Sequence, residues 1–489
     1  MSTTKNAKGN RVEYHYWDYS FEWTDEHRPA SEFESWIHSC DGLADECNQI
    51  LNDLPAPVDD EGGNVSKRDR YALLTGNREK DPKLEELWNQ INTVPEWVNW
   101  AQIQRGQDVY WRYMLPIMNS LTYNSLLGGM GAIRVGETLS RTGGFSATVV
   151  RRRLLETAQH AFQVNSSVDS MKPGGAGHLA CVRVRLLHST VRLKIMSLVE
   201  RDPSYYDVQK YGLPINDLDA FATINTYSST VIWLGLPRQG IHLSNQEMED
   251  YIALWRLVAW YMGAPAEPFE SAAKAKIWSE SLLINEFAPT DTGRILAKNI
   301  VIGMENTAPT YASKEFMDAL ARLLNGDQLS DELHIPQTSL YYRMLMWGYC
   351  LSVKLQAKAL PNIGFIEKYV FEVWNPFLHF PLPPQDTDRE SQLQSRRRMM
   401  WKGLMDEKHG LGKETIFDFK FVPSLNRTTH EGKRKSYRFK RPGLEVLSYM
   451  GLLTAFGSVA ALSTALYLAA AKVLLGSQVV PDLSYLIRA

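Results

Sequence analysis

The sequence predicts an all-α protein, a multi-helix globule, and two observations support this fold class. Apolar residues recur with helical spacing from about residue 84 to residue 360, in segments separated by short turns that contain Gly or Pro. No segment shows sustained alternation of apolar and polar residues, and no strong hairpin signal joins two such segments. With 489 residues, of which 44% are hydrophobic and 22% charged, the chain is long enough for one large helical domain with extensions.

Residues 1–80 are predicted to form an N-terminal arm and one helix. Residues 1–35 are polar and aromatic and are expected to be irregular, whereas 36–55 have the pattern of a helix. The Pro, Gly and charged residues of 54–70 are typical of a loop.

Residues 81–400 are predicted to form the main helical domain. Asp81 and Pro82 are residue types that begin helices. The segments with the clearest helical spacing are 147–167, 178–200, 211–237 and 245–265, and several more helices follow within 268–360. A Pro-rich and then charged connection follows at 376–398.

The C-terminal part of the chain is predicted to attach to a membrane. Residues 446–471 carry no charge over about 26 residues, a length that crosses a bilayer with some tilt. The basic juxtamembrane segment 401–445 precedes this span, and the short tail 472–489 has fewer basic residues. The positive-inside rule therefore predicts a single-pass protein whose bulk is cytosolic. A buried core helix is the alternative, because Gly, Ala, Ser and Thr make the segment less apolar than a Leu-rich span.

Composition and motifs argue against several classes of protein. The formal net charge of −2 gives no indication of nucleic-acid binding. The four cysteines form no C-x-x-C pair, as expected of reduced thiols, and the N-terminus has no apolar segment typical of a secretory signal. A G-x-G-x-x-G turn after a strand, a Walker loop, H-E-x-x-H and G-x-S-x-G are all missing from the sequence.

The segment RVRLLHSTVR, residues 183–192, places a histidine between two arginines. On a helix, Arg185, His188 and Arg192 share one face. Two guanidinium groups on an apolar face require an anionic partner, and a haem would provide one if the imidazole bound the iron and the arginines paired with the propionates. The alternative is a core histidine satisfied by a backbone carbonyl. His178 and His379 are rival ligands, but one follows a glycine turn and the other lies in a Pro-rich segment.

The segment RRRLLETAQH carries a second group of polar residues. Arg153, Glu156, Thr157 and His160 have the spacing i, i+3, i+4 and i+7, so they share a helix face. They could form the wall of a pocket in which an acid or base and hydrogen-bond donors surround bound oxygen. They could instead form a solvated face whose members contact one another. Glu137 is a further acid, sixteen positions before Arg153.

Taken together, these segments resemble the latex clearing protein or rubber oxygenase family, which shares its catalytic domain with endoplasmic-reticulum-bound oxygenases of natural-product pathways. The resemblance runs from about Arg105 to Pro265. It is carried by RGQDVYWRY, LLGGMGAIRVGETLSRTGGF, RRRLLETAQH, RVRLLHSTVR, YGLPINDLDAFATINTYSS and LWRLVAWYMGAP. It implies a globin-like helical core that holds one haem b, with His188 as the iron ligand and with Arg185 and Arg192 steadying the haem.

The resemblance also implies a distal side and a reaction. Arg153 and Thr157 would belong to the distal side, with Glu137 as the candidate acid or base. The sequence itself does not decide whether Glu137 or Glu156 moves the proton. Dioxygen would be inserted across a carbon–carbon double bond of an apolar, isoprenoid-like small molecule to give two carbonyl products. Rubber oxygenases carry a lysine directly before the threonine, whereas this chain has Glu156 there, which argues against a lysine cap on the iron and against polymer cleavage by the same detailed route.

The sequence thus predicts a membrane-anchored, haem b-dependent oxygenase of the endoplasmic reticulum with a cytosolic catalytic domain. One alternative is a helical haem-binding or interaction protein at a membrane that catalyses no reaction. Another is a haem-free helical metalloprotein, which would require Glu-x-x-His pairs that the sequence does not offer.

Overall fold

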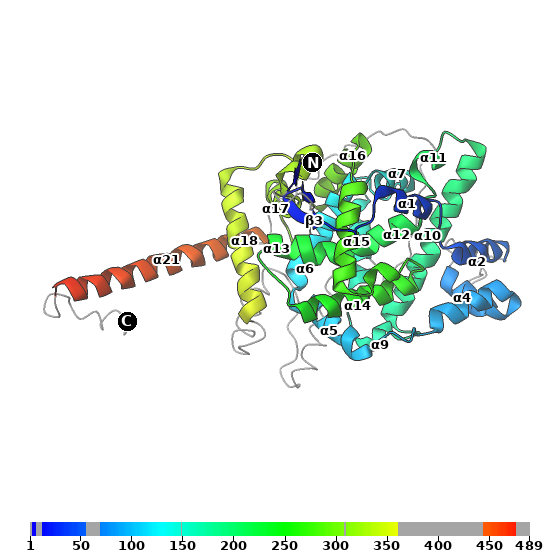
Figure 1. The fold of residues 1–489 in the computed structure, drawn as a ribbon, viewed down its shortest axis with the longest axis horizontal. Helices are drawn as coiled ribbons and strands as arrows, with labels where there is room; N and C mark the ends of the chain where they lie inside the picture. The colour runs from blue at the N-terminus through cyan, green and yellow to red at the C-terminus, as the bar shows by residue number, and fades with distance from the viewer. Residues whose placement is uncertain are drawn as a thin grey trace.

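The structure, a computed structural model, describes residues 2–5, 12–54, 69–147, 149–307, 310–359 and 444–475 (Figure 1). Helices dominate these residues, which confirms the all-α fold class in its main feature. The N-terminal half contains α1 (Ala30–Ile37), α2 (Gly42–Asp53), α3 (Arg70–Asn77), η1 (Arg78–Lys80), α4 (Pro82–Asn92), α5 (Trp100–Arg112), α6 (Met114–Ser120), η2 (Leu121–Leu127), η3 (Gly128–Gly131), α7 (Ile133–Thr142), α8 (Val150–Val164), α9 (Val168–Met171) and α10 (Ala176–Arg201).

The remaining helices complete the body of the molecule and extend from it. They are α11 (Val208–Tyr211), α12 (Asp217–Tyr227), η4 (Val231–Gly235), α13 (Leu236–Arg238), α14 (Asn245–Tyr261), η5 (Glu267–Phe269), α15 (Ala272–Asn285), α16 (Asp291–Met304), α17 (Lys314–Glu332), α18 (Leu340–Ala359) and α21 (Leu444–Leu475). The loop at 54–70, the connection at 376–398 and the basic segment before α21 lie mostly or wholly outside the described residues, and the proposed domain boundaries stay predictions.

The sequence predicted an irregular N-terminal arm, and this prediction is wrong. The arm forms a three-stranded antiparallel sheet. Its strands are β1 (Ser2–Lys5), β2 (Val12–Tyr16) and β3 (Tyr19–Trp23), in the order β1-β2-β3. Trp17 and Asp18 join β2 to β3 with φ values of 49° and 57°. Two-residue hairpins need this left-handed conformation and normally obtain it from Asn or Gly. The hairpin lacks these residues, which is why its sequence signal was missed.

The long helix α10 packs against α8, α2 and α14. It begins two residues before the predicted segment 178–200 and ends one residue after it. Buried side chains lie on several of its sides. Figure 1 shows α2 and α4 at the end of the body opposite α18 and α21. The helix α14 begins with a capping box, in which the Ser244 hydroxyl accepts from the Glu247 amide and the Glu247 carboxylate accepts from the Ser244 amide. These helices fix the position of the residues that α10 presents to the interior.

The predicted helix over 211–237 is broken in the structure. The helix α12 ends at Tyr227, and the π-helical stretch η4 begins at Val231. A second π-helical stretch, η2, interrupts the chain between α6 and η3. Widened helical turns of this kind occur frequently at functional sites, and both stretches contribute side chains to the cavity described below.

The helix α21 covers the segment 446–471 for which the sequence predicts a transmembrane span. Its first turns pack on α18 and bury Leu444, Leu447 and Ser448, and the rest projects away from the body (Figure 1). Part of the predicted span is thus used for packing inside the protein. Within the part of the chain that the structure describes, no helix combines the length and apolar character needed to cross a membrane.

Replacing Gly451 with alanine is expected to destabilise the contact between α18 and α21. An added Cβ would lie 2.1 Å from the Ser352 Oγ and 2.3 Å from the Gly348 carbonyl oxygen, so the helices would have to separate. We expect the free energy of unfolding to fall by roughly 1–3 kcal/mol in urea denaturation. Gly457 is the matched control, because nothing lies within 4 Å of its added Cβ; alanine there should stabilise the helix by roughly 0.5–1 kcal/mol. If both variants changed the free energy of unfolding in the same direction, the close packing of α21 on α18 at Gly451 would be contradicted.

Candidate functional site

A large cavity of about 960 Å³ lies inside the helical body and is lined mostly by apolar side chains. The helices α8, α10 and α12 and the π-helical stretches η2 and η4 contribute to its walls, together with residues of β2, β3 and α15. Its volume is at the upper end of the range for small-molecule and cofactor sites. Several of the site residues that the sequence predicted line this cavity.

His188 lines this cavity from α10. Among the described residues no hydrogen-bond partner is found for either ring nitrogen of His188. Burial, the Arg192 guanidinium and the His160 ring together lower the pKa of His188 to about 4, while Asp41 opposes them. The imidazole is therefore uncharged at neutral pH and keeps a lone pair that can bind a metal ion.

His160 lies in the same cavity, on α8. Its Nε2 is 3.5 Å from the Cys181 Sγ, and burial lowers the pKa of His160 to about 4. His160 and His188 both line this cavity. The sequence assigned His160 only to the polar face of its helix, so its place in the same cavity as His188 is an addition from the structure.

The other residues of the predicted polar face also line the cavity. Arg153, Glu156 and Thr157 all contribute to its wall. The Glu156 carboxylate is held by two arginines, with Arg152 Nε at 3.0 Å and Arg153 Nη1 at 2.7 Å. Burial raises the pKa of the Tyr227 hydroxyl, and a hydrogen bond with Thr157 partly opposes this shift. Both Glu156 oxygens thus accept hydrogen bonds from guanidinium groups.

Glu137, the predicted distal acid, is not among the residues that line the cavity. It is buried, and its Oε2 accepts a hydrogen bond from Arg141 Nη1 at 2.7 Å, one helical turn later on α7. Arg141 also donates to the Glu137 and Tyr205 carbonyl oxygens. The prediction placed Glu137 in the distal pocket, whereas in the structure Glu137 pairs with Arg141 outside the cavity lining, and the neighbouring Thr138 and Leu139 line the cavity.

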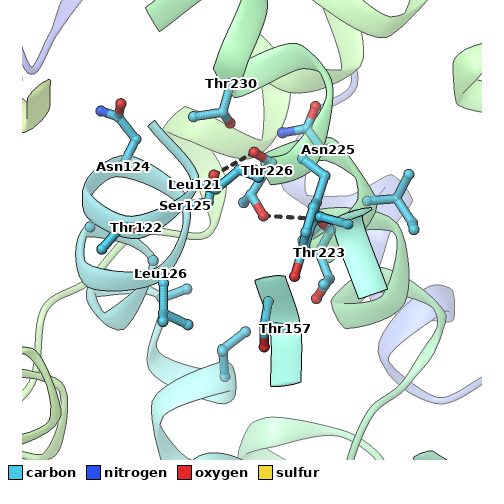
Figure 2. Close-up of a pocket in the computed structure, with 18 of the residues that line it drawn as sticks. Leu121, Thr122, Asn124, Ser125, Leu126, Thr157, Thr223, Asn225, Thr226 and Thr230 are labelled. Atoms are coloured by element: carbon cyan, nitrogen blue, oxygen red, sulfur yellow. Dashed lines mark hydrogen bonds between the residues drawn. The ribbon is translucent and has the colours of Figure 1, made fainter. Parts of the chain in front are cut away.

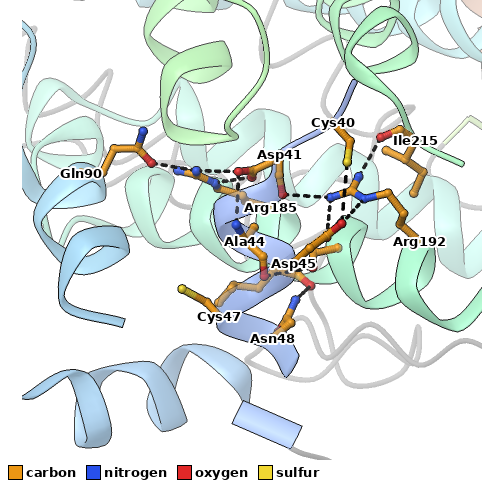
Figure 3. A network of polar contacts seen from close by, with 12 residues as sticks. Cys40, Asp41, Ala44, Asp45, Cys47, Asn48, Gln90, Arg185, Arg192 and Ile215 are labelled. Atoms are coloured by element: carbon orange, nitrogen blue, oxygen red, sulfur yellow. Dashed lines mark hydrogen bonds and ion pairs between the residues drawn. The ribbon is translucent and has the colours of Figure 1, made fainter. Parts of the chain in front are cut away.

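Arg185 and Arg192 also differ from the prediction, because neither lines the cavity. Figure 3 shows their guanidinium groups directed at the carboxylates of Asp41, the N-cap of α2, and of Asp45 within α2. Arg185 donates to both oxygens of Asp41, at 2.6 and 2.9 Å, and Arg192 to both oxygens of Asp45, at 2.7 and 2.6 Å. Two aspartates of the protein therefore provide the anionic partners that the sequence required, and the pairing of these arginines with haem propionates stays a prediction.

Asp219 is a cavity residue that the sequence analysis did not single out. It lies within the quoted segment YGLPINDLDAF, but no local pattern distinguishes it from Asp217. Burial raises the pKa of Asp219 to about 6, although the Arg134 guanidinium, 3.5 Å away, opposes this effect. Arg134 also pairs with Glu286. A buried carboxyl group with a pKa of this size can gain or lose a proton near neutral pH, which suits an acid or base.

Replacing Asp219 with asparagine is expected to flatten the pH dependence of stability. Its folded-state pKa of about 6 lies above the ordinary value of 3.8. The stability that it contributes is therefore fully present below about pH 4 and is lost as the pH rises through about 6. Between pH 4 and 7, the free energy of unfolding in urea should fall by up to roughly 2–3 kcal/mol less in the variant than in the wild type. The exposed Asp53→Asn serves as control, and a variant curve parallel to that of the wild type would contradict the assignment.

The rival histidines are poorer candidates for a ligand. His178 is buried with both ring nitrogens engaged, one by the Gly174 amide at 3.1 Å and the other by the Ile91 carbonyl oxygen at 2.7 Å. His379 lies outside the described residues. Over the described ranges, no group of three or more His, Cys, Asp or Glu side chains is arranged to hold a metal ion.

Comparisons with known proteins agree on one family. Residues 111–353 match the family described as "ER-bound oxygenase mpaB/B'/Rubber oxygenase, catalytic domain". The solved structure of latex clearing protein in the closed state has a similar fold, with a TM-score of 0.50 and 16% sequence identity over 82% of this chain and 93% of that chain. Aurantioclavine synthase cnsA of Penicillium expansum is 40% identical over 53 residues, which span only 11% of this chain and 11% of that protein.

The family match includes every site residue that the sequence predicted, from Glu137 to Arg192, and it also includes Asp219. It assigns no role to any of them, so their roles stay predictions. The fold likeness extends well beyond the matched segment. Residues 111–353 of this chain thus match the catalytic domain of the family of ER-bound oxygenases of the mpaB type and rubber oxygenases.

Proposed function

We propose that this oxygenase depends on haem b and adds dioxygen to a carbon–carbon double bond of an apolar, isoprenoid-like small molecule. The observation that carries the proposal is His188, an uncharged imidazole without a hydrogen-bond partner among the described residues, on the wall of a large and mostly apolar cavity. The match to an oxygenase family supports the reaction class. A bound haem would supply the redox chemistry that activates dioxygen.

The residues of the cavity fit such a cofactor in part. His188 would provide the nitrogen that holds the iron, and the apolar walls would suit the porphyrin ring. The arginines proposed earlier for the propionates are bound to Asp41 and Asp45, so they would act through the position of α10 and not by direct contact. Arg153 also lines the cavity and pairs with Glu156, which lies in the same wall.

The remaining polar residues would orient the substrate and move protons. Thr157 and Tyr227 bring hydroxyl groups to the cavity wall, where they can donate hydrogen bonds to an oxygen atom. Asp219 is the carboxyl group best suited to proton transfer, because its raised pKa lies close to neutral pH. The glutamate at position 156 distinguishes this chain from rubber oxygenases and favours a small molecule over a polymer.

Spectroscopy and isotope labelling together test the proposal. Purified full-length protein should show a Soret band that shifts on reduction with dithionite. Incubation with an isoprenoid alkene under ¹⁸O₂ should place the label in aldehyde or ketone products, detected by mass spectrometry. A Soret band without consumption of any alkene would favour the alternative, a haem-binding protein that catalyses no reaction. A colourless protein that still oxidises the alkene would exclude haem dependence.

We further propose that the chain attaches to the cytosolic side of the endoplasmic reticulum membrane through α18 and α21. Large apolar side chains are exposed on both helices: Leu340, Tyr341, Trp347, Leu355, Tyr449, Met450, Leu453, Phe456, Leu466 and Tyr467. The sequence GKRKSYRFKRPG directly before α21 adds positive charge that suits anionic headgroups.

Vesicle flotation tests this attachment. The protein should float with vesicles that contain phosphatidylserine, and less with phosphatidylcholine alone. Replacing Trp347 and Phe456, which are 72% and 55% exposed, with serine should reduce flotation. Equal recovery of wild type and variant in the unbound fraction would contradict the proposal.

A further inference from the structure

One wall of the cavity carries a group of uncharged hydrogen-bonding side chains, which we call the polar wall. It consists of Thr122, Ser125, Thr223, Asn225, Thr226 and Thr230. These residues come from η2, from α12 and from the break between α12 and η4. Figure 2 shows Asn225, Thr226 and Thr230 together, with Thr157 of α8 across the pocket in this view. A cavity for a pure hydrocarbon would not need such a wall.

The hydroxyl groups of the polar wall are mostly satisfied within the protein. Thr122 donates to the Met118 carbonyl oxygen, and Thr223 to the Asp219 carbonyl oxygen, each at 2.8 Å. Thr226 donates to the Thr223 carbonyl oxygen at 2.8 Å. These hydroxyl groups have therefore used their single proton, and they can offer a ligand only the lone pairs of their oxygens.

Asn225 differs from its neighbours. Its side chain is only 5% exposed, and its Oδ1 is buried without a hydrogen-bond partner among the described residues. Native proteins leave few buried amides in this state, because the amide loses its hydrogen bonds to water and gains none in return. An amide that lines a cavity offers both a donor and an acceptor to whatever enters it.

We propose that Asn225 binds an uncharged hydrogen-bonding group of the substrate, such as a hydroxyl group. This inference rests on the proposed function and narrows its substrate class to an isoprenoid-like chain that carries a polar, uncharged substituent. A hydroxyl group can donate to Oδ1 and accept from Nδ2 of the same amide. A charged group would be disfavoured there, because no member of the polar wall could neutralise it and the nearby Asp219 is paired with Arg134.

Binding titrations with two probes of the same carbon skeleton test the inference. Farnesol carries a hydroxyl group and farnesene carries none, and Trp233 and Trp255 in the cavity wall provide a fluorescence signal. In the haem-loaded full chain, Asn225→Leu should weaken farnesol binding about tenfold and leave farnesene binding unchanged or tighter. Thr75→Val is the matched control and should change neither affinity, because Thr75 does not line the cavity and its hydroxyl proton is bound within its own helix.

The outcomes separate this inference from the proposed function. If wild type binds both probes equally and Asn225→Leu changes neither affinity, the polar subsite is wrong but the proposed function stands. If wild type binds neither probe, the isoprenoid-like substrate class fails and the subsite fails with it. If Asn225→Leu loses the Soret band, the amide serves the cofactor and the inference is overturned. Asn225→Ala repeats the test if leucine prevents folding.

Discussion

Replacing His188 with glycine is expected to abolish binding of haem b. The imidazole lines the cavity and has no hydrogen-bond partner among the described residues, so it is free to bind iron. Without it, the cavity would hold a porphyrin only by apolar contacts. We expect the Soret absorbance per protein to fall at least about tenfold after dialysis, as for the loss of a metal ligand or of its support. Added imidazole should restore the band, because it can occupy the space that the side chain leaves.

Two histidine variants make this result specific. His160→Leu changes the other ring of the cavity, and we expect it to retain haem, because His160 has Cys181 as a partner. His178→Gln changes a ring whose two nitrogens contact backbone groups, and it should lower stability but not haem content. Loss of haem in His160→Leu but not in His188→Gly would show that the iron ligand is misassigned.

The sequence predicted the parts of the site that lie on one helix. The spacing of Arg153, Glu156 and Thr157 predicted a shared face, and the structure places all three on the cavity wall. His188 was found in the same way, because it lies within an apolar helix. These predictions depend only on the geometry of a regular helix, which is a local property.

The parts that depend on distant segments could not be predicted in this way. Asp41 meets Arg185 across 144 positions of sequence, and no local pattern indicates that contact. Arg141 and Glu137 form an ion pair within α7. Which side of α7 faces the cavity, however, depends on how other helices pack against it. Asp219 becomes notable only through its burial.

Replacing Asp45 with alanine is expected to destabilise the protein by about 3 kcal/mol, because it breaks a largely buried ion pair. The side chains of Arg192 and Asp45 are only 4% and 17% exposed, and two hydrogen bonds join them. The variant leaves a guanidinium inside the protein with only the Ile215 and Asp41 carbonyl oxygens as acceptors. Urea unfolding at neutral pH measures the change, which is a large fraction of the stability of a typical domain.

The double variant Asp45→Leu, Arg192→Leu separates a structural role from a role in cofactor binding. Removing both charges leaves no unpaired group, so most of the lost stability should return. If Arg192 acts only by holding α10 against α2, the double variant should also keep its Soret band, because His188 stays in place. A stable double variant that no longer binds haem would show that Arg192 contacts the cofactor directly, in contrast to the pairing with Asp45 in Figure 3.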